Sequence, residues 1–323
     1  MPTLPPDDDT ERVRTLDDLR RWCRDAPSLA VIGKPIAHSR SPRMHNAALA
    51  AVVADAAPAA SPVAGWRYFK FEIEPADLDA ALALFHEKGF RGLNLTLPHK
   101  VLALASPLVR AVSDRAAAAG AANVLVRRDD GFLGDNTDGA GFVRSVAEDL
   151  GVAAAGADVV LLGAGGAARG VGAALLDAGC RTLWLANRSP ERLRALAEAL
   201  RKSFPERAAG GVIREFAMDA AERDGALASA VFARGALVAN ATSLGLREGD
   251  PSPVPARFWR PDLLAIDIAV FGGRSETAFL REARAAGART TDGRGMLCWQ
   301  GALAFGQWTG LPAPVPVMRA ALE

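Results

Sequence analysis

The sequence predicts an α/β protein of two domains. Its 323 residues exceed the length of one average domain. Short apolar segments alternate with longer alanine-rich, helix-compatible stretches, the rhythm that βαβ units produce. A second series of the same kind begins at Asp158, which predicts a second sheet with its own core.

The first series lies between residues 29 and 138. Residues 29–32, 69–73 and 92–97 are apolar runs that predict strands, and residues 76–88 have the spacing of a helix. Residues 1–28 begin with Pro and Asp and continue as a charged helical segment, so they are interpreted as an N-terminal extension.

The second series predicts a parallel sheet. Helix-compatible stretches separate most of its apolar runs, as parallel strands require. These predicted strands cover residues 158–163, 182–186, 211–216, 237–240 and 263–268. From residue 295 onward the spacing is that of helices, which could pack back on either half.

Composition and charge exclude several classes of protein. A formal net charge of +1 offers no broad field for nucleic acid or an anionic membrane. Cys23, Cys180 and Cys298 are odd in number and widely spaced, which fits neither a disulfide framework nor a zinc site. The N-terminus lacks the features of a signal peptide, and no apolar run is long enough to span a membrane. A cytoplasmic location is therefore expected.

A glycine-rich turn follows the strand at 158–162. It consists of Gly163, Ala164, Gly165, Gly166 and Ala167, the start of a GxGxxA pattern that leads into a helix. Glycines let the backbone approach a pyrophosphate, whose charge meets the N–H groups at the helix start. The pattern therefore predicts a Rossmann dinucleotide-binding domain, and the alternative is a tight turn that only joins strand to helix.

The residues at the end of the next strand indicate which dinucleotide would bind. An NAD site usually has an acidic residue there, but this chain has Asn187, Arg188 and Ser189. A guanidinium pairs with a 2′-phosphate, whereas a carboxylate would repel it, so NADP is favoured. In the alternative interpretation, Asn187 or Ser189 caps the helix that starts near Pro190, and Arg188 is only solvated.

Two hydroxyls, those of Ser39 and Ser41, stand two residues apart before Pro42. In an extended backbone they point the same way, and two aligned donors suit a carboxylate. Ser41 and Pro42 also form a good N-cap and first-turn pair, which is the structural alternative.

Polar residues alternate with leucines in a predicted strand at 92–97. Asn94 and Thr96 fall on one face, and Asn123 and the GDNTDG segment that contains Asp138 follow later. A group of Ser, Thr, Asn, Lys and Asp suits a polyhydroxylated acid, because each hydroxyl taken from water needs a partner. Any single Asn or Thr could instead form a local turn.

Together these motifs resemble the shikimate dehydrogenase family over nearly all of the chain after residue 28. The matching strings are GKPIAHSRSPRMHN, GLNLTLPHK, GAANV, GDNTDGAG, GAGGAA, ANRS, NATSLG and GMLCWQGALAF, in the family's order. The resemblance implies a substrate-binding domain at 29–138, completed by C-terminal helices at 295–323, and a Rossmann NADP-binding domain at 139–294. It implies reduction of 3-dehydroshikimate to shikimate, a step of chorismate and aromatic amino acid biosynthesis, by a monomer or homodimer.

The resemblance also implies roles for individual residues. Lys100 and Asp138 would form the catalytic pair, without a metal. The substrate would contact Ser39, Ser41, Asn94, Thr96, Asn123 and Gln300. The cofactor would meet the glycine turn, residues 187–189, and the strand-ending segment with Asn240, Thr242 and Ser243, which could alternatively be a plain turn.

Physical chemistry supports the catalytic pair. Hydride addition to a ketone leaves negative charge on oxygen, which the ammonium of Lys100 can stabilise and then protonate. A carboxylate such as Asp138 orients that ammonium and balances its charge. In the structural alternative, Lys100 is a solvated lysine and Asp138 caps a helix before Gly139.

One segment departs from the family. Where the family usually has a tyrosine three residues after Asp267, this chain has Val270 and Phe271, and its only tyrosine is Tyr68. Two alternatives therefore stand beside 3-dehydroshikimate reduction. One is a dehydrogenase of the same family that prefers quinate, an aminated ring analogue or NAD, and the other is a noncatalytic NADP-binding regulatory protein.

Overall fold

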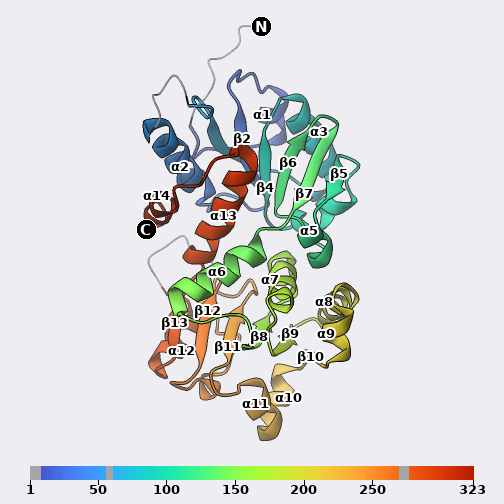
Figure 1. Ribbon diagram of the computed structural model, residues 1–323, viewed down its shortest axis with the longest axis vertical. Coiled ribbons are helices and arrows are strands. Elements are labelled where there is room, and N and C mark those ends of the chain that lie inside the picture. The colour runs from blue at the N-terminus through green and yellow to red at the C-terminus, as the bar shows by residue number, and fades with distance from the viewer. Residues whose placement is uncertain (1–8, 56–60, 269–275) are drawn as a thin grey trace. The chain divides into compact units, whose positions relative to one another are not determined.

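The computed structural model describes residues 9–55, 61–268 and 276–323. The chain forms two compact units, both of them α/β as predicted (Figure 1). The first unit comprises Met1–Thr137 and Gln300–Glu323, and the second comprises Asp138–Trp299. No helix in the described part of the chain is both long and apolar enough to cross a membrane.

The first unit contains a seven-stranded mixed sheet with the order β1-β3-β2-β4-β6-β7-β5. Its strands are β1 (Val13–Arg14), β2 (Ser28–Gly33), β3 (Arg67–Glu72), β4 (Gly92–Leu95), β5 (Val109–Val112), β6 (Val124–Arg128) and β7 (Gly131–Asp135). The parallel pairs among β1 to β4 are those that a βαβ rhythm predicts. The antiparallel hairpin of β6 and β7 differs from that expectation, and it turns at Asp129 and Asp130.

Helices cover both faces of this sheet. They are α1 (Leu16–Arg20), α2 (Ser41–Asp55), α3 (Leu78–Glu87), α4 (His99–Leu102), α5 (Asp114–Ala119), α13 (Arg294–Thr309) and α14 (Val315–Ala320), with short 3₁₀ turns η2 (Pro75–Asp77) and η3 (Ala103–Ala105). The boundary before Gln300 falls within α13. The C-terminal helix α14, red in Figure 1, lies beside α2, which is blue.

The two faces of the first sheet differ in chemistry. Phe69 and Phe71 of β3 join Leu93 and Leu95 of β4 in one apolar cluster. Because side chains alternate along a strand, Tyr68 projects from the opposite face. That face carries the polar residues described below.

The described part of the N-terminal segment, which was predicted to be an extension, packs into the first unit. β1 pairs in parallel with β3, and Leu19 is fully buried in the apolar cluster. Arg14 is 2% exposed, and its guanidinium lies over the rings of Phe69 and Trp22. Stacking on aromatic rings and bonds to two backbone carbonyls offset the cost of burying this charge.

The second unit contains a six-stranded, fully parallel sheet with the order β10-β9-β8-β11-β12-β13. Its strands are β8 (Asp158–Leu162), β9 (Thr182–Ala186), β10 (Ile213–Glu215), β11 (Leu237–Asn240), β12 (Leu264–Asp267) and β13 (Arg289–Thr291). Its helices are α6 (Asp138–Leu150), α7 (Gly166–Asp177), α8 (Pro190–Ser203), α9 (Pro205–Ala209), α10 (Met218–Arg223), α11 (Gly225–Val231) and α12 (Ala278–Ala285), with the 3₁₀ turn η4 (Ala256–Phe258).

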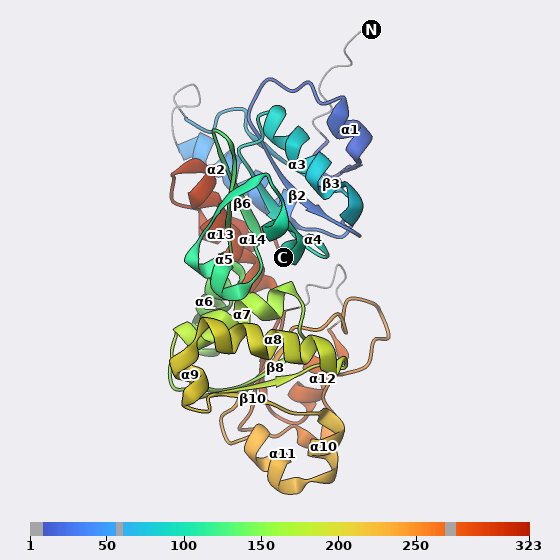
Figure 2. The same ribbon diagram turned by 90° about the vertical axis from the view of Figure 1, so that its right-hand side faces the viewer.

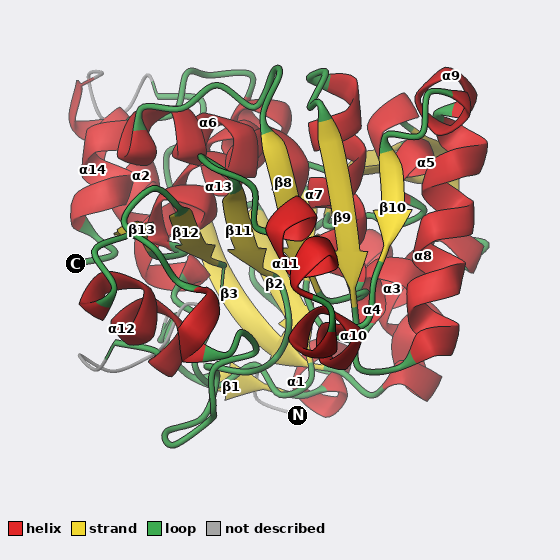
Figure 3. Ribbon diagram, turned by 90° about the horizontal axis from the view of Figure 1, so that it is seen from below, coloured by secondary structure: helices red, strands yellow, loops and turns green. Residues whose placement is uncertain are grey.

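The strand order of the second sheet reverses between β8 and β11. The chain proceeds from β8 outward through β9 and β10, then returns to the other side of β8 with β11. Such a reversal is where doubly wound sheets bind ligands, at the carboxyl ends of the strands. Figure 3 shows these strands in yellow, and Figure 2 shows α8 lying over one face of the sheet.

Candidate functional site

The glycine turn of the second unit follows β8 directly. Gly163 has φ +110°, and a Cβ at this position would lie 2.5 Å from the carbonyl oxygen of Ala241. Only glycine combines that backbone angle with so close an approach. The turn therefore lies against the segment that follows β11.

The start of α7 is shaped to receive an anion. Gly165 is the N-cap of this 12-residue helix, and a Cβ added there would meet nothing within 4 Å. The first N–H groups of a helix have no partner within it, and its dipole favours negative charge there. A dinucleotide site must accommodate a pyrophosphate, and residues 163–167 fit this group.

Residues 187–189 follow β9, the next strand. The side chain of Ser189 accepts a hydrogen bond from the N–H of Arg192, so Ser189 is the N-cap of α8, as the structural alternative predicted. Asn187 donates to the carbonyl of Ser189 at 3.0 Å. Arg188 is exposed. Of the three side chains, the guanidinium of Arg188 is the one placed to meet a ligand.

The segment after β11 is held by its own side chains. Asn240 is fully buried, and its Oδ1 accepts hydrogen bonds from the backbone N–H and the hydroxyl of Thr242. Its Nδ2 donates to the carbonyl of Leu244 and to the carboxylate of Asp267. Asn240 and Thr242 therefore shape the turn, whereas Ser243 is exposed.

Asp138 is the first residue of α6 and is only 4% exposed. Its neighbour Gly139 packs against α7: a Cβ there would lie 2.2 Å from the carbonyl oxygen of Gly170. This contact explains why glycine follows the carboxylate. It also sets Asp138 on the helix beside the one that starts at the glycine turn.

In the first unit, the two predicted serines lie next to each other. Residues 36–39 form a turn rather than the expected extended backbone, because the N–H of Ser39 donates to the carbonyl of Ile36 at 3.0 Å. The hydroxyl of Ser39 accepts from the N–H of Ser41 at 3.4 Å, and α2 begins at Ser41. Ser41 is buried, and Ser39 is half-buried.

Asn94 and Asn123 are joined directly. Nδ2 of Asn94 donates to the backbone carbonyl of Asn123 at 3.1 Å. Nδ2 of Asn123 donates to Oε1 of Gln300 at 3.2 Å, and its Oδ1 accepts from the N–H of Thr137 at 2.7 Å. Three of the predicted substrate residues thus form one network with Thr137.

Thr96 and Lys100 lie just beyond β4. The N–H of Thr96 donates to the carbonyl of Ile32, which extends the ladder past the end of the strand. Lys100 is half-buried in the short helix α4, and its carbonyl accepts from the N–H of Ala122 at 2.7 Å. The backbone of Lys100 is therefore attached to the segment that carries Asn123. Lys100 belongs to the first unit, and Asp138 belongs to the second.

Two residues beside this network were missed in the sequence. The hydroxyl of Tyr68 donates to Oδ1 of Asn94 at 2.7 Å, and the ring of His45 stacks on the ring of Tyr68 at 4.4 Å. Burial raises the pKa of Tyr68 well above its ordinary value, against the effect of a hydrogen bond with Ser41. Burial lowers the pKa of His45 to about 3. Both rings are therefore neutral at ordinary pH.

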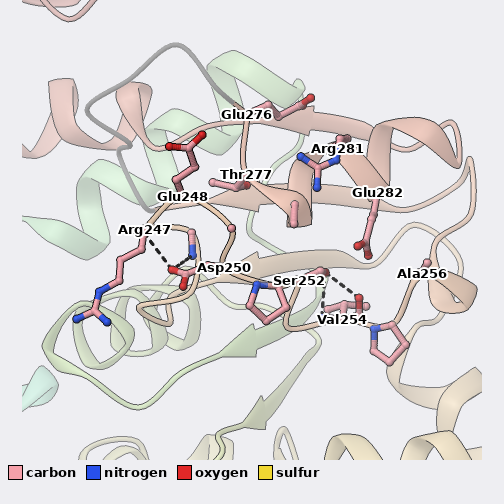
Figure 4. Close-up of a pocket in the computed structure, with 15 residues that line it drawn as sticks. Arg247, Glu248, Asp250, Ser252, Val254, Ala256, Glu276, Thr277, Arg281 and Glu282 are labelled. Carbon is pink, nitrogen blue, oxygen red and sulfur yellow. Dashed lines mark hydrogen bonds between the residues drawn. The ribbon is translucent and has the colours of Figure 1, made fainter.

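A separate cavity of about 490 Å³ opens in the second unit between the turn at residues 245–256 and α12. Figure 4 shows Asp250, which accepts hydrogen bonds from the N–H groups of Gly245 and Arg247, on one side of the cavity and Arg281 and Glu282 of α12 on the other. The predicted cofactor residues do not line this cavity. Among the described residues, no group of three or more acidic, His or Cys side chains is arranged to hold a metal ion.

The segment after Asp267, where the family's tyrosine is missing, lies mostly outside the described residues, which resume at Glu276. The described residues on either side of this segment are joined by a hydrogen bond: the hydroxyl of Thr277 donates to the carboxylate of Asp267 at 2.7 Å.

Comparison with known families gives three matches along the chain. Residues 31–125 match the shikimate dehydrogenase substrate binding domain, residues 145–209 match shikimate/quinate 5-dehydrogenase, and residues 293–323 match the shikimate 5′-dehydrogenase C-terminal domain. A shikimate dehydrogenase (NADP⁺) from Moorella thermoacetica is 42% identical over 91% of this chain and 92% of its own length.

Solved structures agree with this assignment. Shikimate 5-dehydrogenase from Thermus thermophilus, in complex with NADP(H) and shikimate, is 35% identical, with a TM-score of 0.74 over 92% of this chain and 98% of its own. Quinate dehydrogenase from Corynebacterium glutamicum, in complex with NAD, is 29% identical, with a TM-score of 0.74 over 92% and 99% of the two chains. The chain therefore belongs to the shikimate dehydrogenase family.

Proposed function

We propose that the protein is an NADP-dependent shikimate dehydrogenase, which reversibly reduces 3-dehydroshikimate to shikimate. The observation that carries this proposal is the buried network of Asn94, Asn123 and Gln300 in the first unit. A ring acid with several hydroxyls needs such a set of fixed donors and acceptors, because an unpaired buried polar group costs about 1–3 kcal/mol.

The second unit would hold the cofactor. Residues 163–167 fit the pyrophosphate, because the start of α7 offers backbone N–H groups and Gly165 leaves open space. Arg188 would pair with the 2′-phosphate. Ser243 would offer its hydroxyl, while Asn240 and Thr242 would act by holding the turn that contacts Gly163.

Bound NADPH would supply a hydride to the ketone carbon. The ammonium of Lys100 would then stabilise the negative charge that develops on the ketone oxygen and donate a proton to it. Asp138 would keep the ammonium charged and oriented, and would take part in proton transfer in the reverse direction.

The first unit would hold the substrate. Ser39 and Ser41 would bind the carboxylate through their hydroxyls, and Asn94, Thr96, Asn123 and Gln300 would contact the ring hydroxyls. We assign substrate binding to residues 29–138 with 295–323, and NADP binding to residues 139–294. The expected setting is the cytoplasm, with the protein as a monomer or homodimer.

Quinate or an aminated ring analogue is the second candidate substrate. The sequence favours it at one place, where Val270 and Phe271 stand instead of the family's tyrosine. A quinate dehydrogenase also has this fold, as the comparison with the Corynebacterium glutamicum protein shows. A noncatalytic regulatory protein is disfavoured because Lys100 and Asp138 are both present.

The proposal is tested by following absorbance of the reduced nicotinamide with purified protein, shikimate and NADP⁺. Turnover that depends on both compounds is the expected result. Cofactor binding without turnover of any ring acid would support the regulatory protein and exclude the enzyme.

A further inference from the structure

Tyr68 spans a whole strand to reach the substrate network. In the first sheet β2 lies between β3 and β4, and Tyr68 of β3 is level with Leu29 of β2, whereas Asn94 of β4 is level with Val31. Neighbouring strands lie about 4.8 Å apart, so β3 and β4 are separated by roughly 10 Å. Only a long side chain with a polar end can connect them across the buried surface of β2.

The hydrogen bonds of Asn94 leave one orientation for its amide. The carbonyl of Asn123 can only accept, so Nδ2 of Asn94 must face it, at 3.1 Å. Oδ1 then faces Tyr68 and needs a donor, which the phenol supplies at 2.7 Å. Since a primary amide nitrogen carries two hydrogens, the group that Asn94 offers to a ligand is its second N–H.

His45 fixes the ring that carries this donor. Its imidazole is 0% exposed, stacks on Tyr68 with an interplanar angle of 11°, and lies 5.3 Å from the ring of Trp308. Within the described residues, neither ring nitrogen of His45 has a hydrogen-bond partner. The imidazole therefore acts here as a flat, neutral ring rather than as a proton carrier.

We propose that Tyr68 is a positioning residue that fixes Asn94 as a hydrogen-bond donor toward a substrate oxygen, with His45 as the ring that holds the phenol in place. This inference rests on the proposed function for the identity of the substrate. Tyr68 and His45 would form a buried pair behind the residues that contact the substrate. By fixing Asn94 as a donor, this pair would favour ring acids that present an oxygen acceptor to Asn94.

The test is a double-mutant cycle between Tyr68 and Asn94 in the full-length enzyme. Tyr68→Phe keeps the stacked ring and removes the hydroxyl, with its hydrogen bonds to Asn94 and Ser41. We expect the KM for shikimate to rise about tenfold, with kcat and the KM for NADP⁺ within about twofold. In an Asn94→Ala background, Tyr68→Phe is expected to change the KM for shikimate by less than about twofold.

Three kinetic outcomes would overturn the proposal. They are a KM for shikimate near the wild-type value in Tyr68→Phe, an undiminished effect in the Asn94→Ala background, or a parallel loss of kcat and NADP⁺ affinity, which would indicate a general structural defect. Thr309→Val is the matched control: it removes another hydroxyl from the first unit, bonded to the carbonyl of Phe305, and should leave the kinetics unchanged.

His45 is tested with a ring substitution and a truncation. His45→Phe retains a flat ring, and its KM for shikimate should stay within about twofold of wild type. His45→Ala removes the stack and should raise that KM about as much as Tyr68→Phe does. If His45→Phe raises the KM for shikimate as much as His45→Ala does, the stacking role of His45 is wrong.

A measurement without substrate separates this inference from the proposed function. In ¹⁵N–¹H NMR of the ligand-free protein, the Asn94 side-chain amide is identified by its absence in Asn94→Asp. Its protons should exchange with solvent at least about tenfold faster in Tyr68→Phe than in wild type. Unchanged exchange would overturn the positioning role. Inactivity of wild type toward shikimate, with faster exchange in Tyr68→Phe, would overturn only the proposed function.

Discussion

The two units present their candidate residues in different ways. In the second unit, the glycine turn offers backbone N–H groups, and its geometry depends on positions where a side chain would not fit, such as Gly163. In the first unit, side chains are held by other side chains, as Asn94 is by Tyr68 and Tyr68 is by His45. A backbone site is therefore visible as a sequence motif, whereas a side-chain site depends on partners that are far apart in the sequence.

The largest expected effect tests the chemistry that the first unit would supply. Lys100→Ala should lower kcat by about 10²- to 10⁴-fold, because general-acid catalysis usually contributes that much. The circular dichroism spectrum and NADP⁺ binding should be retained. Lys88→Ala, which removes an ammonium paired with Glu87 in the same unit, is the matched control. A loss of less than tenfold in Lys100→Ala would remove this lysine from the reaction.

The next effect tests the backbone site. Gly163→Ala combines a strained φ with overlap on the carbonyl of Ala241, so unfolding free energy should fall by about 3 kcal/mol or more. Gly165 has an ordinary φ of −84° and open space around it, so Gly165→Ala should lower stability by no more than about 1 kcal/mol, the usual cost of alanine at an N-cap, while NADP⁺ affinity falls. Denaturant titration and calorimetric NADP⁺ binding measure the two effects. Equal behaviour of the two variants would contradict the account of the turn.

A smaller effect concerns Arg188, the exposed side chain among residues 187–189. Arg188→Asp should weaken NADPH binding about 10- to 100-fold more than NADH binding, because a guanidinium bond to phosphate is replaced by charge repulsion. Arg194→Asp is the matched control, because it makes the same charge change at an exposed position of α8. Dissociation constants for both nucleotides check this. Equal losses for NADPH and NADH would refute the 2′-phosphate role.

The smallest effect concerns His45, which stacks on Tyr68 behind the side-chain site, and the dependence of stability on pH. The pKa of His45 is about 3 in the folded protein, because of burial, and 6.5 is its ordinary value. Between these values the unfolded chain binds more protons, so stability falls as pH is lowered from 6.5 toward 3. At pH 5 this costs about 2 kcal/mol. His45→Phe should therefore lose less stability than wild type between pH 7 and pH 5, as measured by urea titration. Equal acid sensitivity would contradict the account.

Local patterns predicted the second unit well. The strands at Thr182–Ala186 and Leu237–Asn240 have the expected bounds, and the glycine turn stands between β8 and α7 as expected. Each of these features depends on neighbouring residues, because a parallel strand buried on both faces is one apolar run. The alternation of leucines with Asn94 in the first unit was also visible, because it too involves only neighbouring residues.

Features of the first unit that join distant segments were not predicted. β1 has two residues, too few for a pattern, and it forms only because β3 offers an edge. Arg14 has the sequence context of a solvated charge, but Trp22 and Phe69 bury it. Tyr68 had no signal in its neighbours, because its partner Asn94 lies 26 residues later.

The central claim is that this chain oxidises shikimate with NADP⁺. A panel of kcat/KM values for shikimate and quinate, each with NADP⁺ and NAD⁺, tests it most directly because specificity is a ratio of these constants. We predict that shikimate with NADP⁺ exceeds every other pair by at least about tenfold. A higher value for quinate or for NAD⁺ would contradict the assignment.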